Sequence, residues 1–219
     1  MNMQTLNPGA KYAHGEFSVG SYDTFMGAIG LGSGKIALAK EYFLSLDGRY
    51  ALSSTHGYIR NAKANLNSLF LQSALENSTN LLKLIYIWGD QSTGITWEGC
   101  PIEIYPTNRK YNSAGEYYDD SGNIQYYGNE TDNYTQHHVQ LHYVHLWRNN
   151  FKINSTLHFT KGDGYYENYK YNQKFSKYGI ENQIIDGETY KKSDFIIRQL
   201  MDNKYYAGTL SFSYTPANL

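Results

Sequence analysis

The chain has 219 residues and a formal net charge of −1, so it can form one large domain or two small ones and has no basic excess of the kind that binds nucleic acid. It contains 23 Tyr, 9 Phe and 3 Trp but only 4 Pro, a balance that favours β structure because aromatic side chains pack well on a pleated surface. Its mean hydropathy is −0.60, and it lacks the roughly 20 consecutive apolar residues of a helical membrane span. Strands that alternate lipid-facing apolar residues with polar ones remain compatible with these values.

Period-two alternation of apolar and polar side chains predicts about eight strands. The clearest covers residues 151–160, where Phe151, Ile153, Ser155, Leu157 and Phe159 share one face and the opposite face is polar. The chain is therefore predicted to be all-β, and periodicity alone leaves both a membrane barrel and a soluble β-sandwich open. In chain order, the predicted strands cover residues 12–22, 24–31, 44–50, 66–75, 82–88, 137–147, 151–160 and 205–214.

The connections between these strands alternate in length. Short turns are predicted at 32–34, 77–80 and 148–150, whereas the segments at about 94–132 and 161–199 are long, polar and rich in Tyr, Asn, Asp and Gly. Outer-membrane barrels have short periplasmic turns and long extracellular loops. Tyr143, Trp88 and Trp147 lie at or near strand ends, where amphipathic rings meet a membrane interface. The pattern favours an outer-membrane barrel.

Several segments resemble the barrel of TonB-dependent outer-membrane receptors, in the same order along the chain. Residues 46–49 read LDGR and residues 53–64 read SSTHGYIRNAKA. Residues 131–138, 157–167 and 201–208 read TDNYTQHH, LHFTKGDGYYE and MDNKYYAG. The resemblance covers roughly residues 40–219, and it depends on the order and spacing of these segments more than on any one of them.

This resemblance implies an antiparallel transmembrane β-barrel segment, with about eight strands of a 22-stranded barrel, so that residues 1–219 form a partial receptor barrel. It implies a location in the cell outer membrane, in contact with lipid. The implied function is energy-coupled uptake of a scarce nutrient, such as an iron chelate (siderophore), a cobalamin-like macrocycle or a glycan. An inner-membrane TonB complex would supply energy through a plug domain.

The family's signal peptide, plug, TonB box and C-terminal strands are not recognisable in the sequence, and residues 1–7 lack a secretory signal. We therefore expect a barrel fragment whose two open edges keep the isolated chain from inserting stably or transporting. Two alternatives remain open. One is a complete eight-stranded outer-membrane barrel with a structural or adhesive role, and the other is a soluble β-sandwich that binds carbohydrate.

Aromatic side chains of the long loops are the candidate ligand-binding residues, because rigid amphipathic rings suit stacking on sugars, chelates or macrocycles. The candidates are Trp97, Tyr105, Tyr117, Tyr118, Tyr126, Tyr127, Tyr165 and Tyr166.

Other chemistry is not predicted. Four histidines lie close in sequence, His137, His138, His142 and His145. His138 and His142 share a strand face but sit roughly 13 Å apart at about 3.4 Å per residue, and the neighbours His137 and His138 point to opposite faces, so no metal site is expected. Cys100 has no partner cysteine, and Asp119-Asp120 fits a solvated turn. Residues 162–164 read GDG but lack the rest of a phosphate-binding loop, so they are predicted to mark a strand entering a loop. No G-x-S-x-G motif occurs. We expect neither an enzyme nor a cofactor.

Overall fold

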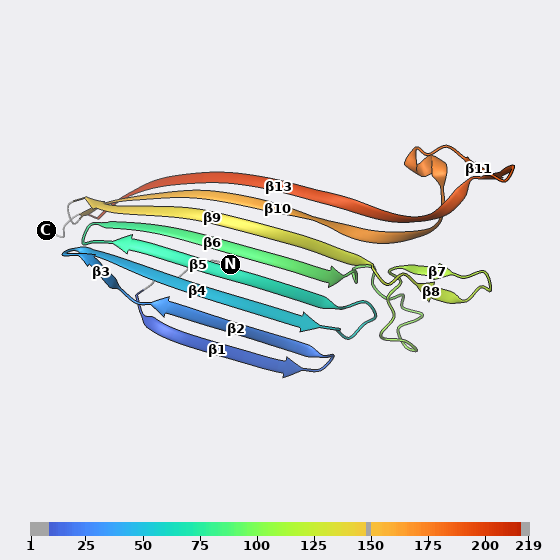
Figure 1. Cartoon of the computed structure of the whole chain (residues 1–219), viewed down its shortest axis with the longest axis horizontal. Helices are drawn as coiled ribbons and strands as arrows, with labels where there is room; N and C mark the ends of the chain where they lie inside the picture. Colours follow the sequence, from blue (N-terminus) through green and yellow to red (C-terminus); the bar gives the residue numbers. More distant parts are fainter. Residues whose placement is uncertain (1–8, 148–149, 216–219) are drawn as a thin grey trace.

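A computed structural model describes residues 9–147 and 150–215 of the chain. One curved antiparallel sheet dominates it, with the strand order β1-β2-β4-β5-β6-β9-β10-β13 (Figure 1). This confirms the predicted all-β class and the eight consecutive main strands. Their bounds are β1 Lys11–Gly20, β2 Thr24–Ser33, β4 Tyr42–Thr55, β5 Ala64–Glu76, β6 Asn80–Gly94, β9 Thr131–Trp147, β10 Phe151–Lys174 and β13 Lys192–Tyr214.

The smaller elements lie in the connections. Strand β3 (Ile36–Ala39) pairs with β4, and two separate hairpins are formed by β7 (Glu116–Tyr118) with β8 (Ile124–Tyr126) and by β11 (Gln183–Ile185) with β12 (Glu188–Tyr190). A short 3₁₀ helix, η2 (Phe175–Tyr178), follows β10. Within the described ranges, no helix is long and apolar enough to cross a membrane.

One face of the sheet carries a continuous apolar band. The register places Leu84, Leu141, Leu157 and Gly208 in one row across β6, β9, β10 and β13. Large apolar side chains on this face stand exposed, for example Leu210 at 62% and Leu157 at 58%. Within the described part of the chain, no second sheet lies over the band.

The opposite face is polar and more crowded. It carries Glu16, Arg49 and His142, and the Arg49 guanidinium lies 2.8 Å from the Glu16 carboxylate. The side chains that are buried in the main part of the sheet lie on this face, among them Ser45 and Ile85 at 1% exposure. Because side chains crowd together on the inside of a curve, this one-sided burial agrees with a polar concave face.

The long connections all lie at one end of the sheet, as predicted (Figure 1). The turn at 77–80 is confirmed between β5 and β6. The turn predicted at 32–34 is part of a longer connection between β2 and β4, which contains β3 and its hairpin with β4. Residues 148–149 of the third predicted turn and residues 1–7 lie outside the described ranges.

The loop predicted over 161–199 was wrong in extent. Strand β10 continues to Lys174 and β13 begins at Lys192, so these strands form a tall hairpin beyond the end of β9, and the connection is 175–191 (Figure 1). Beyond the apolar band, apolar residues occur on both faces of this hairpin, as at the adjacent positions Ile196 and Ile197 of β13, so the alternation that reveals a strand is lost. The other long connection, 95–130, agrees with the predicted 94–132.

Strands β1 and β13 are the two edges of the sheet, and among the described residues they do not pair with each other. The sheet is thus a curved, open antiparallel wall and not a closed barrel. Each edge presents a row of backbone groups of the kind that ordinarily pairs with a further strand.

Candidate functional site

The long connection 95–130 is a folded unit held against the β4–β5 turn. Arg60 reaches into it from that turn and donates from Nε to the Asn112 carbonyl at 2.9 Å and from its terminal nitrogen to the Ala114 carbonyl. Its guanidinium carbon also lies 3.6 Å from the centre of the Tyr126 ring. The Asn112 amide donates back to the Arg60 and Ile95 carbonyls at 2.9 and 2.8 Å. The segment therefore has a defined position.

The β10–β13 hairpin fixes the far side of this unit. Beyond Glu167, β10 has no β9 neighbour, and the Tyr169 N–H at this free edge donates to the Glu130 carboxylate at 2.5 Å. The Asn168 amide donates to the other oxygen of Glu130 at 2.8 Å. A buried carboxylate thus takes the place of a missing strand, so that the edge donor is satisfied.

Glu167 forms a second junction between the connection and the hairpin. Its carboxylate is 1% exposed and accepts hydrogen bonds from the Tyr127 hydroxyl at 2.6 Å, the Asn129 amide at 2.5 Å and Arg198 Nε at 2.5 Å. Burial alone would raise the pKa of Glu167, but these donors outweigh it and hold its pKa below the ordinary value. The same hydrogen bond raises the pKa of the Tyr127 hydroxyl.

Acid is expected to loosen this junction. Because the pKa of Glu167 is lower in the folded state, its contribution to stability is present above the unfolded pKa of about 4.5 and is lost as the pH falls through the folded value. We expect proteinase K to cleave the 95–130 connection faster below about pH 4, with little change between pH 6 and 8. The Glu167→Gln variant should be cleaved readily even at pH 7. A pH profile identical in the variant and the wild type would contradict this assignment.

The structure brings most of the predicted ligand-binding aromatics to this end of the sheet and joins them to rings that were not predicted. The Tyr127 and Tyr169 rings stack with centroids 5.4 Å apart, and Tyr117 lies 5.0 Å from Tyr169. The Tyr117 and Tyr118 rings each lie 6.4 Å from Tyr171. These five tyrosines, from β7, β10 and the segment before β9, form what we call the tyrosine cluster.

The other predicted residues lie around the cluster or apart from it. Trp97 makes an edge contact with Tyr166 at 5.8 Å. Tyr165 lies under the Arg198 guanidinium at 4.7 Å, and Tyr126 lies under Arg60. Tyr105 contacts Arg109 at 5.4 Å, and no ring contact joins it to the others among the described residues. Tyr165 and Tyr166 belong to strand β10 and not to a loop, which corrects their predicted setting.

Two members of the cluster, Tyr169 and Tyr171, were missed. The sequence signal was present, because 165–171 reads YYENYKY with Tyr165, Tyr169 and Tyr171 at even spacing. On a strand, that spacing places three rings on one face. These residues fall within the predicted 161–199 loop, where a strand period has no meaning.

The predicted absence of a histidine metal site remains a prediction, but the surroundings of two of the rings are now defined. His138 Nδ1 lies 2.8 Å from Thr160 Oγ1, and its Nε2 lies 3.0 Å from Gln136 Oε1. His142 has the equivalent contacts at 3.0 Å to Thr156 and 3.1 Å to Gln140. Within residues 9–147 and 150–215, no three His, Cys, Asp or Glu side chains are grouped to hold a metal ion.

Two further sequence features also find their places. Asp119 closes a turn by accepting hydrogen bonds from the backbone N–H groups of Ser121 and Asn123 at 3.0 and 2.8 Å, and the Asn123 bond holds the pKa of Asp119 low. Residues 162–164 lie in the middle of β10 and not where it enters a loop, which corrects that prediction. A side chain at Gly164 would meet the Asn133 carbonyl at 2.1 Å, so this position needs glycine for the close approach of β9.

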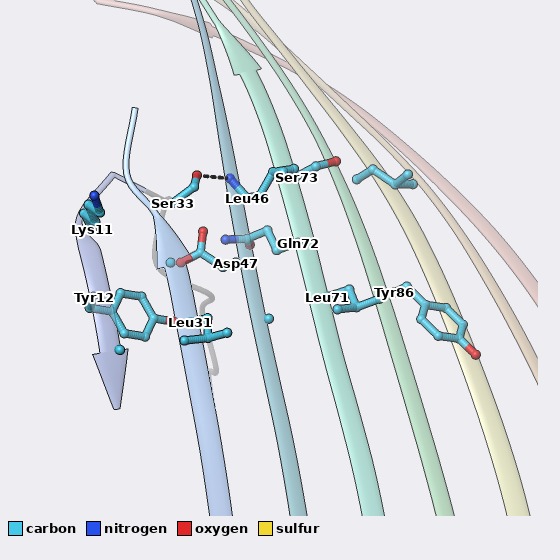
Figure 2. A pocket seen from close by; sticks show the side chains of 14 residues that line it. Lys11, Tyr12, Leu31, Ser33, Leu46, Asp47, Leu71, Gln72, Ser73 and Tyr86 are labelled. Carbon is cyan, nitrogen blue, oxygen red and sulfur yellow. Dashed lines mark hydrogen bonds between the residues drawn. The ribbon is translucent and has the colours of Figure 1, made fainter. Parts of the chain in front are cut away.

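A large hollow lies far from the tyrosine cluster, toward the short-turn end of β1, β2, β4, β5 and β6 (Figure 2). Its volume is about 960 Å³, and Leu31, Leu46 and Leu71 line it from the apolar face. The Ser33 hydroxyl at its rim accepts a hydrogen bond from the Leu46 N–H at 2.9 Å (Figure 2). None of the predicted ligand-binding residues lines it.

Comparison of the chain with protein-family models, curated proteins and solved structures gave no match. Function is therefore argued from the sequence and from this geometry.

Proposed function

We propose that this chain is a wall segment of an outer-membrane receptor that takes up a scarce nutrient, with the tyrosine cluster contacting the nutrient outside the membrane. The observation that carries the proposal is the apolar band on one face of eight consecutive antiparallel strands, with every long connection at one end. In β10 the band runs from Phe151 to Phe159, which matches the ~9–11 residues of a tilted strand that crosses a bilayer.

Aromatic side chains lie at both limits of the band, as interfacial rings do. At the short-turn limit the Phe151 ring contacts Trp147 and Phe212, with ring centroids 6.2 and 6.0 Å apart. At the loop-side limit the Phe159 and Tyr206 rings lie 4.9 Å apart. Lys161 and Lys204 follow on the same face, where a side chain would reach water.

The band also shifts across the hydrogen-bonded rows. In β10 the apolar band ends at Phe159. Following the strand pairing from Phe159 across the sheet leads to Ala13 in β1. In β1, however, the band continues beyond Ala13 toward the loops, to Phe17 and Val19, which are 80% and 75% exposed. In a barrel the strands are tilted, so an apolar band of constant height in the membrane runs at an angle to the rows of paired residues, as it does here. A soluble sandwich would need a second sheet over these side chains.

Uptake, rather than a purely structural role, is favoured by the loop end. The tyrosine cluster is held by Glu130 and Glu167, and Tyr118 and Tyr171 remain 48% and 39% exposed. Rigid rings fixed on a scaffold lose little freedom when a ligand stacks on them. The ligand classes that we propose are a ferric chelate, a cobalamin-like macrocycle and an oligosaccharide.

Nutrient uptake tests the proposal. The gene is deleted in its source organism, and accumulation of labelled ferric chelates, cobalamin and oligosaccharides is measured with and without a protonophore. We expect protonophore-sensitive accumulation of one class to be lost. In the complemented strain, the Tyr117→Ala/Tyr169→Ala variant should raise the half-saturating concentration by about tenfold or more, which corresponds to ~1.4 kcal/mol.

Tyr105→Ala is the matched control for this test, because Tyr105 is an exposed tyrosine of the same connection that lies outside the cluster. It should leave the half-saturating concentration unchanged. Unaltered accumulation of all three classes in the deletion strain would contradict uptake, and a soluble monomer obtained without detergent would contradict the membrane assignment.

A further inference from the structure

We propose that Asp194 of β13 is a positioning residue of the tyrosine cluster, which holds a bulge in β10 and thereby sets how Tyr169 and Tyr171 meet the nutrient. This inference rests on the proposed function, because it assigns a role within the same site. It concerns a residue outside the five rings and an irregularity in the pairing of β10 with β13.

The irregularity lies within the cluster. The pairing of β10 with β13 is regular over 151–170 and then shifts, so that two residues of β10, Tyr171 and Asn172, lie opposite the single residue Asp194 of β13. Two residues that face one make a β-bulge, which bends its strand and often re-aims a side chain beside a functional site. Here one of the two bulge residues is itself a ring of the cluster.

The bulge has an uncommon backbone conformation. Asn172 has a φ of 49°, in the left-handed region that residues with a Cβ seldom adopt, although asparagine tolerates it better than most. Such a conformation costs free energy, so it persists only where surrounding contacts hold it, and it is concentrated at ligand sites and switches. The contact that holds it here is made by Asp194.

The Asp194 carboxylate joins the bulge to the cluster through its two oxygens. Oδ1 accepts a hydrogen bond from the Asn172 N–H at 2.8 Å, and Oδ2 accepts one from the Tyr169 hydroxyl. Burial and this hydrogen bond raise the pKa of Tyr169, so its hydroxyl stays protonated and donates near neutral pH. One carboxylate thus fixes the backbone that follows Tyr171 and the ring orientation of Tyr169.

The two rings that depend on Asp194 meet the rest of the cluster at β7. The Tyr117 ring lies 5.0 Å from Tyr169 and 6.4 Å from Tyr171. The Tyr118 ring lies 6.4 Å from Tyr171 at an angle of 57°, and both of these rings are exposed. Their mutual angle decides which ligand surface can contact both, so Asp194 affects binding through the placement of rings that it supports.

Uptake kinetics test this inference in the complemented strain, with the labelled compound whose accumulation the deletion abolishes. We expect Asp194→Ala to raise the half-saturating concentration about tenfold, equivalent to ~1.4 kcal/mol, and to leave the maximal rate per receptor unchanged. Asp194→Asn should give a smaller rise, because its amide oxygen can accept from the Asn172 N–H whereas its amide nitrogen cannot accept from Tyr169. A lower maximal rate with an unchanged half-saturating concentration would mean that Asp194 only stabilises the fold, and it would overturn the inference.

The bulge residue offers a matched pair of variants. Asn172→Gly can keep a positive φ and should behave as the wild type, whereas Asn172→Val resists that conformation and should raise the half-saturating concentration as Asp194→Ala does. Asp202→Asn removes an exposed carboxylate of the same strand away from the bulge and should change nothing. Equal half-saturating concentrations for Asn172→Gly and Asn172→Val would contradict a role for the bulge.

A measurement without ligand separates this inference from the proposed function. In the full chain extracted in mild detergent, light-driven oxidation by tris(bipyridyl)ruthenium(II) and persulfate joins neighbouring tyrosines, and mass spectrometry quantifies the cross-linked peptides. We expect cross-links between 117–118 and 169–171 in the wild type and a severalfold loss of them in Asp194→Ala. Unchanged cross-linking in that variant would overturn the inference even where uptake occurs. If the deletion strain accumulates every nutrient class normally, the proposed function fails, and the cross-linking result still decides whether Asp194 sets the rings.

Discussion

Arginine at position 210 is expected to deplete the protein from the outer membrane, whereas arginine at the adjacent position 209 is not. Leu210 lies on the apolar face of β13 at the middle of the band, in the same row as Ser155 of β10. An arginine on the lipid-facing side of a barrel strand costs ~2–4 kcal/mol near the bilayer midplane. That cost is a large fraction of the stability of a protein domain.

Thr209 makes the comparison a matched one. It is the next residue on the same strand, is also exposed, and points to the polar face, where Thr156 is its partner on β10. Both variants carry the same added charge, and Thr209→Arg gives up a β-branched strand former, so β propensity does not favour the expected result. The measurement is the amount of heat-modifiable protein in the outer-membrane fraction of cells that express the native gene. Equal depletion by Leu210→Arg and Thr209→Arg would show that the apolar face of the sheet does not face lipid.

The sequence was sufficient to predict the strands wherever one face of the sheet is apolar. Period-two alternation identified 151–160, 205–214 and 137–147, since most large apolar side chains of each stretch lie at every second position. The alternation did not predict strand structure beyond the end of the apolar band. The segments 161–174 and 192–204 form the tall hairpin of β10 and β13, but their two faces differ too little in polarity to show a period.

The candidate site was predictable in its parts and not in its assembly. Aromatic residues in the 95–130 connection could be selected from composition alone. Their contacts with Tyr169 and Tyr171 could not, because these depend on β10 continuing past the end of β9. The buried carboxylates Glu130 and Glu167 were also missed. Their role depends on contacts between strand β10 and the 95–130 connection. Glu130 is 38 residues from its partner Asn168, and Glu167 is 40 residues from its partner Tyr127.

The Arg60→Ala substitution is expected to release the 95–130 connection from the sheet. It would leave the carbonyls of Asn112 and Ala114 without the donors that now satisfy them, and Asn112 is 1% exposed. A buried polar group without a partner costs ~1–3 kcal/mol, and loss of the cation–π contact with Tyr126 adds ~0.5–2 kcal/mol.

Limited proteolysis of intact cells by proteinase K measures this release. We expect cleavage within 95–130 to accelerate by about tenfold or more, because local opening scales with the lost free energy. Arg109→Ala is the control, since Arg109 belongs to the same connection and contacts Tyr105 at 5.4 Å; it should be cleaved at the wild-type rate. Arg60→Lys should resemble Arg60→Ala, because one ammonium group cannot reproduce the planar fork that serves both carbonyls and the ring. If Lys at position 60 protected the connection fully, charge alone would anchor it, and the tyrosine cluster would not depend on the geometry of this arginine.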